Sequence, residues 1–283
     1  GLPAGVFNLV SGHGSEVGDY MSSHPDVDMV SFTGSTGAGV SVSQSAAPTI
    51  KRVTLELGGK SANVALEDAD PVLVAKKAIG ACHQNSGQTC SALTRLIIPE
   101  SMNKQVCDII AEKNDSYLVG NPLDEGTRCG PMVSLRQQLS VTEYIQSGID
   151  EGANLISGGL GMPDGIEKGF YVKPTIFANV TPEMKIWKEE IFGPVLVITT
   201  YNTESEALKL ANDSIYGLSG GVWSKDSDRA VNFAKKIRTG QVSVNGGSFN
   251  VSAPFGGYKL SGNGRELGTH GLDEFLEIKS IQL

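Results

Sequence analysis

The feature that most constrains the fold of this 283-residue chain is an alternation of short apolar runs with helix-compatible segments. In the first part of the chain, this alternation predicts strands at 6–10, 27–32 and 53–57 and helices at 15–22 and 33–46. It returns later and predicts strands at 195–201, 221–223 and 241–245 and helices at 204–212 and 226–238. Strands and helices that alternate at this spacing form parallel βαβ units. We therefore expect an α/β fold, although the first part holds too few units for a complete dinucleotide-binding sheet.

Further elements are predicted between these two parts and at the end of the chain. In the middle, helices are predicted at 72–81, 101–114 and 134–150 and a strand at 93–98. Near the end, residues 260–266 resemble a loop and residues 272–276 a helical turn. Residues 277–283 alternate apolar and polar side chains, so we expect a terminal strand there. Such a strand could pair with another sheet or subunit, or form an edge of its own domain.

The composition narrows the class of protein. A net charge of −8 and the lack of any basic run argue against nucleic acid as a partner. No apolar segment approaches the roughly 18–20 residues that span a bilayer, so we expect no membrane association. Four cysteines are too few for a disulfide scaffold in a chain of this length, and they indicate free thiols in a reducing compartment. We therefore expect a cytoplasmic protein, with an organellar matrix as the alternative.

Residues 84–90 (Gln-Asn-Ser-Gly-Gln-Thr-Cys) place a cysteine on polar and bendable backbone. Buried structural cysteines usually lie inside apolar runs instead. Cys90 is therefore a candidate nucleophile, and this segment alone leaves open a loop cysteine without a function. His83 raises a rival mechanism, a Cys–His dyad of the hydrolase type, although a packed or solvated helix histidine also fits its position. The cysteines and histidines show no spacing typical of a metal site.

Glu56 lies at the end of an apolar strand and is followed by two glycines. A carboxylate in this place is costly unless it is hydrogen-bonded or solvated, and partial burial raises its pKa toward the range useful to a general base. Catalytic groups in open α/β sheets gather at the carboxyl ends of strands, where we expect Glu56 to lie. The alternative is an ordinary surface charge at the end of a strand.

Residues 33–36 (Thr-Gly-Ser-Thr) form a polar glycine turn between a predicted strand and a predicted helix. Such a turn presents backbone N–H groups and the positive end of a helix, which suits a phosphate group. It is neither the spaced-glycine dinucleotide fingerprint nor a P-loop. An ordinary helix N-cap is the alternative.

Four longer motifs follow one another along the chain: residues 56–61 (Glu-Leu-Gly-Gly-Lys-Ser), 85–90 (Asn-Ser-Gly-Gln-Thr-Cys), 190–195 (Glu-Ile-Phe-Gly-Pro-Val) and 254–259 (Pro-Phe-Gly-Gly-Tyr-Lys). Residues 32–35 (Phe-Thr-Gly-Ser) precede them, and residues 264–266 (Gly-Arg-Glu) follow. Together they closely resemble the aldehyde dehydrogenase superfamily, whose members are NAD(P)-dependent enzymes that oxidise aldehydes to acids. The resemblance covers essentially the whole chain, from residue 1 to about 279.

The resemblance implies an organisation in three parts. Residues 1–58 would form the end of a Rossmann-like cofactor-binding domain, and residues 59–262 an α/β catalytic domain of the aldehyde dehydrogenase type. Residues 263–283 would form a return segment with an oligomerisation strand, and the protein would be a homodimer or homotetramer.

The resemblance also implies a role for each site residue. Cys90 would form a thiohemiacetal and then a thioester with the substrate, and its own backbone N–H would help to hold the oxyanion. Glu56 would activate the water that hydrolyses the thioester. Glu266 would relay protons from Glu56, with an ion pair to a neighbouring Arg or Lys as the alternative. The implied residues that bind NAD or NADP are Gly34, Ser35, Leu57, Gly58, Glu190 and Phe192. Among these, Ser35 would meet the pyrophosphate, Glu190 the ribose and Phe192 the nicotinamide.

The sequence also departs from the pattern of this family. A full member is much longer and carries, before the point that matches Gly1, an asparagine of the oxyanion hole and a lysine at the adenosine ribose. The chain starts without a methionine and runs at once into a predicted strand, so we expect a fragment cut within a domain. The presence of Glu56 favours water over coenzyme A as the acyl acceptor. Asn245 resembles a residue at the mouth of the substrate tunnel.

Two other functions stay open at this point. One is a catalytically silent truncated module that binds a nucleotide or a partner. The other is a thiol acyl-transfer or esterase enzyme that uses Cys90 and Glu56 without hydride transfer.

Overall fold

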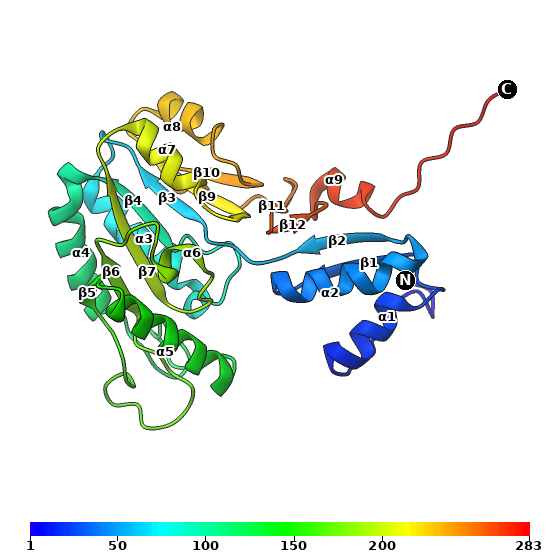
Figure 1. Ribbon diagram of the computed structural model, residues 1–283, viewed down its shortest axis with the longest axis horizontal. Coiled ribbons are helices and arrows are strands. Elements are labelled where there is room, and N and C mark those ends of the chain that lie inside the picture. Colours follow the sequence, from blue (N-terminus) through cyan, green and yellow to red (C-terminus); the bar gives the residue numbers. More distant parts are fainter.

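The computed structural model describes residues 1–283, and its largest element is a seven-stranded sheet (Figure 1). The strand order is β10–β9–β3–β4–β7–β6–β5, and every neighbouring pair is parallel except β5–β6. The strands are β3 (Ala62–Ala65), β4 (Arg95–Pro99), β5 (Asn154–Ser157), β6 (Thr175–Ala178), β7 (Val195–Tyr201), β9 (Ser219–Trp223) and β10 (Gln241–Val244). This mostly parallel sheet with its crossover helices confirms the predicted α/β fold.

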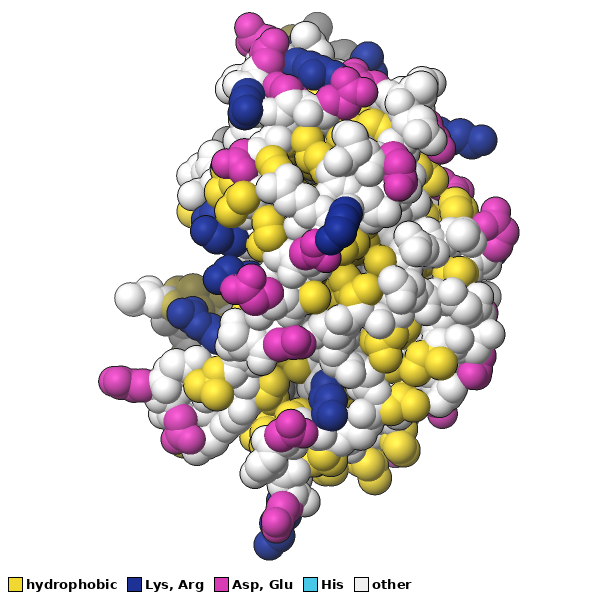
Figure 2. All heavy atoms as spheres, turned by 90° about the vertical axis from the view of Figure 1, so that its left-hand side faces the viewer, with side chains coloured by type: hydrophobic (Ala, Val, Ile, Leu, Met, Phe, Trp, Pro, Cys, Tyr) yellow, Lys and Arg dark blue, Asp and Glu magenta, His cyan; other side chains and the backbone are white.

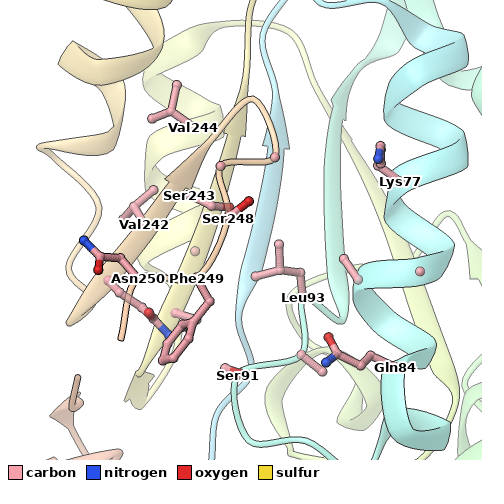
Figure 3. A pocket seen from close by; sticks show the side chains of 18 of the residues that line it. Lys77, Gln84, Ser91, Leu93, Val242, Ser243, Val244, Ser248, Phe249 and Asn250 are labelled. Carbon is pink, nitrogen blue, oxygen red and sulfur yellow. The ribbon is translucent and has the colours of Figure 1, made fainter. Parts of the chain in front are cut away.

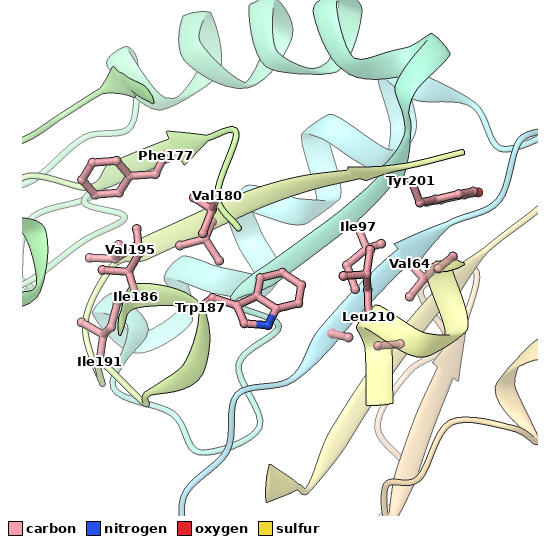
Figure 4. Close-up of a cluster of buried hydrophobic side chains, with 14 of the residues drawn as sticks. Val64, Ile97, Phe177, Val180, Ile186, Trp187, Ile191, Val195, Tyr201 and Leu210 are labelled. Atoms are coloured by element: carbon pink, nitrogen blue, oxygen red, sulfur yellow. The ribbon is translucent and has the colours of Figure 1, made fainter. Parts of the chain in front are cut away.

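Helices cover both faces of this sheet. They are α3 (Pro71–His83), α4 (Asn103–Asp115), α5 (Leu135–Asp150), α6 (Lys185–Lys188), α7 (Glu204–Asn212) and α8 (Ser227–Ala234). In β4, Leu96 and Ile98 pack in the cluster that contains α3 and α4. Ile97 points the other way, into the cluster with Trp187 and the remaining helices (Figure 4). Because both faces are buried, the central strands read as continuous apolar runs rather than as an alternation.

A buried arginine joins the large sheet to the segment that follows Glu56. Arg95 donates hydrogen bonds of 2.9–3.0 Å to the carbonyls of Leu210, Ala211 and Asp213, which satisfies the orphan carbonyls at the end of α7. Its Nε donates to the Lys60 carbonyl at 2.8 Å. The connection between the two sheets is therefore held at a defined place in the core.

A second sheet of three strands lies apart from the first (Figure 1). Its elements are β1 (Met29–Thr33), β2 (Arg52–Glu56) and β12 (Gly262–Asn263), with α1 (Asp19–Ser23), α2 (Thr36–Ala46) and α9 (Gly268–Asp273) beside them. β1 and β2 are parallel, whereas β12 comes from the far end of the chain and pairs antiparallel with β2. The short strands β8 (Tyr216–Gly217) and β11 (Tyr258–Lys259) form a separate pair. The end of the chain thus returns to the sheet with which it began.

Most predicted elements are confirmed, and several helix starts follow from capping. Ser35, Thr203 and Asp226 precede α2, α7 and α8, and each side chain accepts a hydrogen bond from a backbone N–H of the first turn. The limits of β7 and α7 agree with those predicted from the sequence.

Two predicted strands do not form in the single chain. Residues 6–10 and 277–283 pair with no strand, and apolar side chains such as Leu9 (81% exposed) and Ile278 (99%) face solvent. An apolar pattern describes one face of a strand, but the backbone also needs the edge of a neighbouring strand. The predicted helix at 226–238 ends early at Ala234, and the predicted loop at 260–266 contains β12. The predicted division into three parts stays a prediction.

No helix is both long and apolar enough to cross a lipid bilayer, and α5, with 16 residues, is the longest. Figure 2 shows acidic and basic side chains interspersed on the face turned to the viewer, with apolar side chains between them.

Candidate active site

Cys90 lies at the end of a tightly turned loop that follows α3. Asn85, Ser86 and Gly87 take left-handed backbone conformations, with φ of 51°, 57° and 73°. Non-glycine residues keep such conformations only when the surrounding structure holds them. Ser86 supplies part of that hold, because its Oγ accepts a hydrogen bond from the Gly130 N–H at 2.8 Å and donates one to the Gly130 carbonyl at 3.1 Å.

Gln88 holds the same loop at a second point. Its Oε1 accepts a hydrogen bond from the Val133 N–H at 2.8 Å, and its Nε2 donates to the Pro131 carbonyl at 3.3 Å. The polar residues before Cys90 therefore fasten the loop to residues 130–133. The sequence indicated only that this backbone is polar, and it gave no sign of the partner segment.

Glycines bring this loop against motifs that are distant in the sequence. A Cβ atom at Gly59 would lie 2.5 Å from the Cys90 carbonyl oxygen, and one at Gly87 would lie 2.1 Å from the Gly193 carbonyl oxygen. Side chains do not approach backbone this closely, so only glycine permits the two contacts. The three motifs that contain these residues therefore meet at one place.

Glu56 ends β2 and is almost completely buried, with 6% of its surface exposed. Neither of its carboxylate oxygens has a hydrogen-bond partner. Burial is the main cause that raises the pKa of Glu56 from 4.5 to about 7, and the charge of Glu266 raises it further while that of Arg265 lowers it. A carboxylate that titrates near neutrality is suited to act as a general base at pH 7.

The last two motifs of the chain approach Glu56 together. A Cβ atom at Gly256 would lie 2.7 Å from the Glu56 Oε1. Phe255 and Glu266 exchange two backbone hydrogen bonds of 2.7 Å, which hold the two motifs side by side. Glu266 is half-buried and forms no salt bridge, so the ion pair considered from the sequence is not formed. Its charge acts instead on Glu56.

The negative charges of two carboxylates affect the pKa of the half-buried Cys90 thiol. Burial is the largest cause that raises the pKa of Cys90, followed by the negative charge of Glu190, and the charge of Glu56 raises it as well. A hydrogen bond to the Ser91 backbone partly opposes this effect. Both carboxylates therefore act on the Cys90 thiol through their negative charge, which disfavours the thiolate.

Glu190 is bound to the segment that follows β2. Its Oε1 accepts a hydrogen bond from the Gly59 N–H at 3.0 Å, and a Cβ atom at Gly58 would lie 2.0 Å from its Oε2. Burial raises the pKa of Glu190, while the Gly59 N–H and the charge of Lys60 lower it. Phe192, two residues later, has a φ of 54° and keeps 37% of its surface exposed. Glu190 and Gly58, both predicted to bind the cofactor, are thus in contact.

The predicted phosphate-binding turn lies beside Glu56 on the smaller sheet. The Gly34 N–H donates to the Glu56 carbonyl at 3.1 Å. Ser35 Oγ accepts a hydrogen bond from the Ala38 N–H at 3.3 Å and so acts as the N-cap of α2. Leu57 is buried and would contact any side chain placed at Gly39 of α2. The N-cap role is therefore observed, and the phosphate-binding role stays a prediction.

A cavity of about 590 Å³ opens beside the Cys90 loop (Figure 3). It lies between α3 and residues 241–254, and the two neighbours of Cys90, Thr89 and Ser91, line it. Lining residues that the sequence did not single out include Lys77, Leu93, Val242, Phe249 and Asn250. Cavities of this size commonly hold small molecules. Its wall combines segments that are far apart in the sequence, so no local pattern could have predicted it.

Two residues considered from the sequence have other partners. Asn245 Oδ1 accepts a hydrogen bond from the Ser224 N–H at 3.0 Å. His83 is fully buried, its Nε2 lies 2.9 Å from Asn114 Oδ1, and its ring packs against Tyr117. Burial lowers the pKa of His83 to about 4. A neutral, packed imidazole engaged with Asn114 favours a structural residue over the base of a Cys–His dyad.

Comparison with known proteins identifies the family. The model of the aldehyde dehydrogenase family matches residues 1–281. A curated relative, the 3-succinoylsemialdehyde-pyridine dehydrogenase of a Pseudomonas species, is 52% identical over 281 residues, which are 99% of this chain and 59% of the relative. The chain therefore belongs to the aldehyde dehydrogenase family, and it spans about 59% of the length of the curated relatives it matches.

Solved structures share the fold. A mutant of aldehyde dehydrogenase C from Pseudomonas syringae, crystallised with NAD+ and octanal, has a TM-score of 0.96 at 50% identity, covering 98% of this chain and 57% of that one. Betaine aldehyde dehydrogenase from Staphylococcus aureus, crystallised with NAD+, has a TM-score of 0.94 at 40% identity, covering 97% and 55%.

Proposed function

We propose that the full-length protein carrying this sequence is an NAD(P)-dependent aldehyde dehydrogenase that oxidises an aldehyde to a carboxylic acid. The observation that carries this proposal is a buried carboxylate, Glu56, that has no hydrogen-bond partner and whose charge raises the pKa of the Cys90 thiol. Membership of the family supports it, as do the two relatives crystallised with NAD+. Because the relatives are longer than this chain, the activity is assigned to the full-length protein.

The residues at the site fit a dinucleotide cofactor. The amino end of α2 presents free backbone N–H groups beside Glu56, which suits a pyrophosphate. We assign cofactor binding to Gly34, Ser35, Leu57, Gly58, Glu190 and Phe192. Glu190 would exchange its hydrogen bond with the Gly59 N–H for the ribose hydroxyls. Bound NAD(P) would supply the acceptor for the hydride that leaves the substrate carbon.

In the mechanism, Cys90 gives its proton to solvent water and its Sγ attacks the aldehyde carbonyl carbon, which gives a thiohemiacetal. The Cys90 backbone N–H stabilises the resulting oxyanion. Once the carbon is oxidised, the substrate remains bound to Cys90 as a thioester. Glu56 then takes a proton from water, the hydroxide adds to the thioester carbonyl, and the carboxylic acid leaves as the Cys90 sulfur departs. Glu266, whose charge already acts on Glu56, would relay the proton to solvent.

Glu56→Gln in the full-length protein tests the role of the base. We expect one burst of NADH per active site followed by a loss of steady turnover of at least about a hundredfold, because thiohemiacetal formation survives while hydrolysis fails. Stopped-flow absorbance with an excess of aldehyde separates the two phases. Cys90→Ala should abolish both phases, and Glu143→Gln on the exposed face of α5 should change neither. Undiminished steady turnover in Glu56→Gln would reject the proposed base.

The rival thiol acyl-transfer or esterase function predicts a different pattern. It requires hydrolysis of a p-nitrophenyl ester that is insensitive to substitution of Glu190 or Phe192, with no NADH formed from any aldehyde. A silent module would show neither activity in the full-length protein, although it could still bind the nucleotide.

We further propose that residues 277–283 pair with another subunit in a homodimer or homotetramer. Their alternating apolar side chains are exposed in the single chain, and Figure 1 shows this segment extending away from both sheets. We also propose a division of the chain into three parts at 1–58, 59–262 and 263–283. The chain leaves the smaller sheet after β2 and returns to it at β12, which supports these boundaries.

A further inference from the structure

One face of α3 forms a wall of the cavity beside Cys90. Lys77, Gly80 and Ala81 line the cavity, and their spacing of three and four residues places them on the same side of α3. Gln84, the residue directly after α3, lines the cavity as well. Figure 3 shows Lys77 and Gln84 at opposite ends of this wall, with Ser91 beside Gln84. The wall therefore runs from the Cys90 loop to Lys77.

The charge of the cavity is opposite to that of the chain. Its lining contains two cations, Lys76 and Lys77, and no aspartate or glutamate. Neither lysine forms a salt bridge. In a chain with a net charge of −8, a cavity with two unpaired cations and no acidic residue attracts anions.

The rest of the lining favours a ligand with polar groups along its length. Ser243, Ser248 and Asn250, from β10 and the loop after it, lie across the cavity from α3 (Figure 3). Their hydroxyl and amide groups can donate hydrogen bonds to oxygen atoms. The middle of the α3 wall leaves room for such a ligand, because a Cβ atom at Gly80 would meet nothing within 4 Å.

From these observations we infer that the preferred substrates are aldehydes with a second, anionic group of the carboxylate kind at the far end of the molecule. The carbonyl would lie at the Cys90 loop, beside Thr89 and Ser91, and the carboxylate at Lys77. Gln84 follows Lys77 by seven positions, which is a rise of about 10 Å along a helix, so the two ends of the substrate would be about 10 Å apart. This inference rests on the proposed function and specifies the class of its substrate.

The test compares 9-oxononanoate with its methyl ester, which has the same length and no charge. For the full-length protein we expect kcat/KM to be roughly tenfold higher for the acid, which is the effect of one hydrogen-bonded charge pair. Lys77→Met should remove most of this preference, and Lys77→Glu should reverse it. Lys113→Met, on the exposed side of α4, is the matched control and should leave the preference unchanged. Propanal, which is too short to reach Lys77, should yield NADH in the wild type and at the same rate in Lys113→Met.

A second measurement does not depend on turnover. Binding of nonanedioate, the product of the acid, to the full-length protein can be followed by calorimetry and should weaken roughly tenfold in Lys77→Met. The inference is overturned if the methyl ester is oxidised as well as the acid, or if the Lys77 variants change neither the preference nor nonanedioate binding. The proposed function fails separately, if none of these aldehydes, propanal included, yields NADH.

Discussion

At the scale of residues, the site contains buried ionisable side chains without hydrogen-bond partners, which are rare in protein cores. Glu56 and Lys60 are both buried, and neither the Glu56 oxygens nor the Lys60 Nζ have a hydrogen-bond partner. Burial disfavours the charged form of each, so it raises the pKa of Glu56 to about 7 and lowers that of Lys60 to about 7. Violations of this kind are expected where a site is arranged for chemistry rather than for stability.

The reactivity of Cys90 provides a prediction at this scale. Because burial, Glu190 and Glu56 raise the pKa of Cys90, its alkylation by iodoacetamide should reach half its maximal rate at a pH above the ordinary thiol pKa. Glu56→Gln removes one negative charge and should shift this midpoint to lower pH. Peptide mass spectrometry follows each cysteine separately. Cys107, whose pKa is raised to about 11 by burial and Asp108, is the internal control and should not respond. A Cys90 midpoint that Glu56→Gln leaves in place would contradict the shared site.

At the scale of elements, the Cys90 loop depends on a segment that carries no chemistry. Asn85 and Ser86 are two consecutive non-glycine residues in costly left-handed conformations, and Ser86 and Gln88 hold the loop by hydrogen bonds to residues 130–133. The sequence suggested that Cys90 is a nucleophile because its surroundings are polar. The structure shows that those polar side chains serve to position the loop.

Ser86→Ala tests this support. The substitution leaves the Gly130 N–H and carbonyl without their partner, so the free energy of unfolding should fall by about 1–3 kcal/mol. Urea unfolding of the 283-residue chain measures the change. Ser116→Ala is the matched control, because Ser116 is exposed and bonds only to the Lys113 carbonyl, and its effect should stay within about 0.5 kcal/mol. Equal losses in the two variants would show that Ser86 does not support the loop.

At the scale of the whole molecule, the two sheets differ in how much of them is buried. Every residue of β4 is buried, because helices cover both faces of the large sheet. No residue of β1 in the smaller sheet is fully buried. We therefore expect the smaller sheet to open locally at a lower free-energy cost than the large sheet.

Native-state hydrogen exchange of the 283-residue chain tests this difference. Amides of β4 and β7 should exchange most slowly, those of β1 at least about tenfold faster, and those of residues 277–283 without protection. Mass spectrometry of peptic peptides resolves these segments. Equal protection of β1 and β7 would show instead that the two sheets unfold as one cooperative unit.

The sequence by itself determined the α/β class, most helices and central strands, the family, and the candidates Cys90, Glu56 and Glu190. It could do so because periodicity, capping and motifs are properties of neighbouring residues. Only the tertiary structure decided that Gly59 touches Cys90, that Glu190 binds the Gly59 N–H, and that Lys77 lines the cavity. It also decided that residues 6–10 form no strand, since a strand requires a partner edge that a local pattern cannot supply. Only the tertiary structure raises the pKa of Glu56 as well, because the segments that bury this carboxylate meet only when the chain is folded.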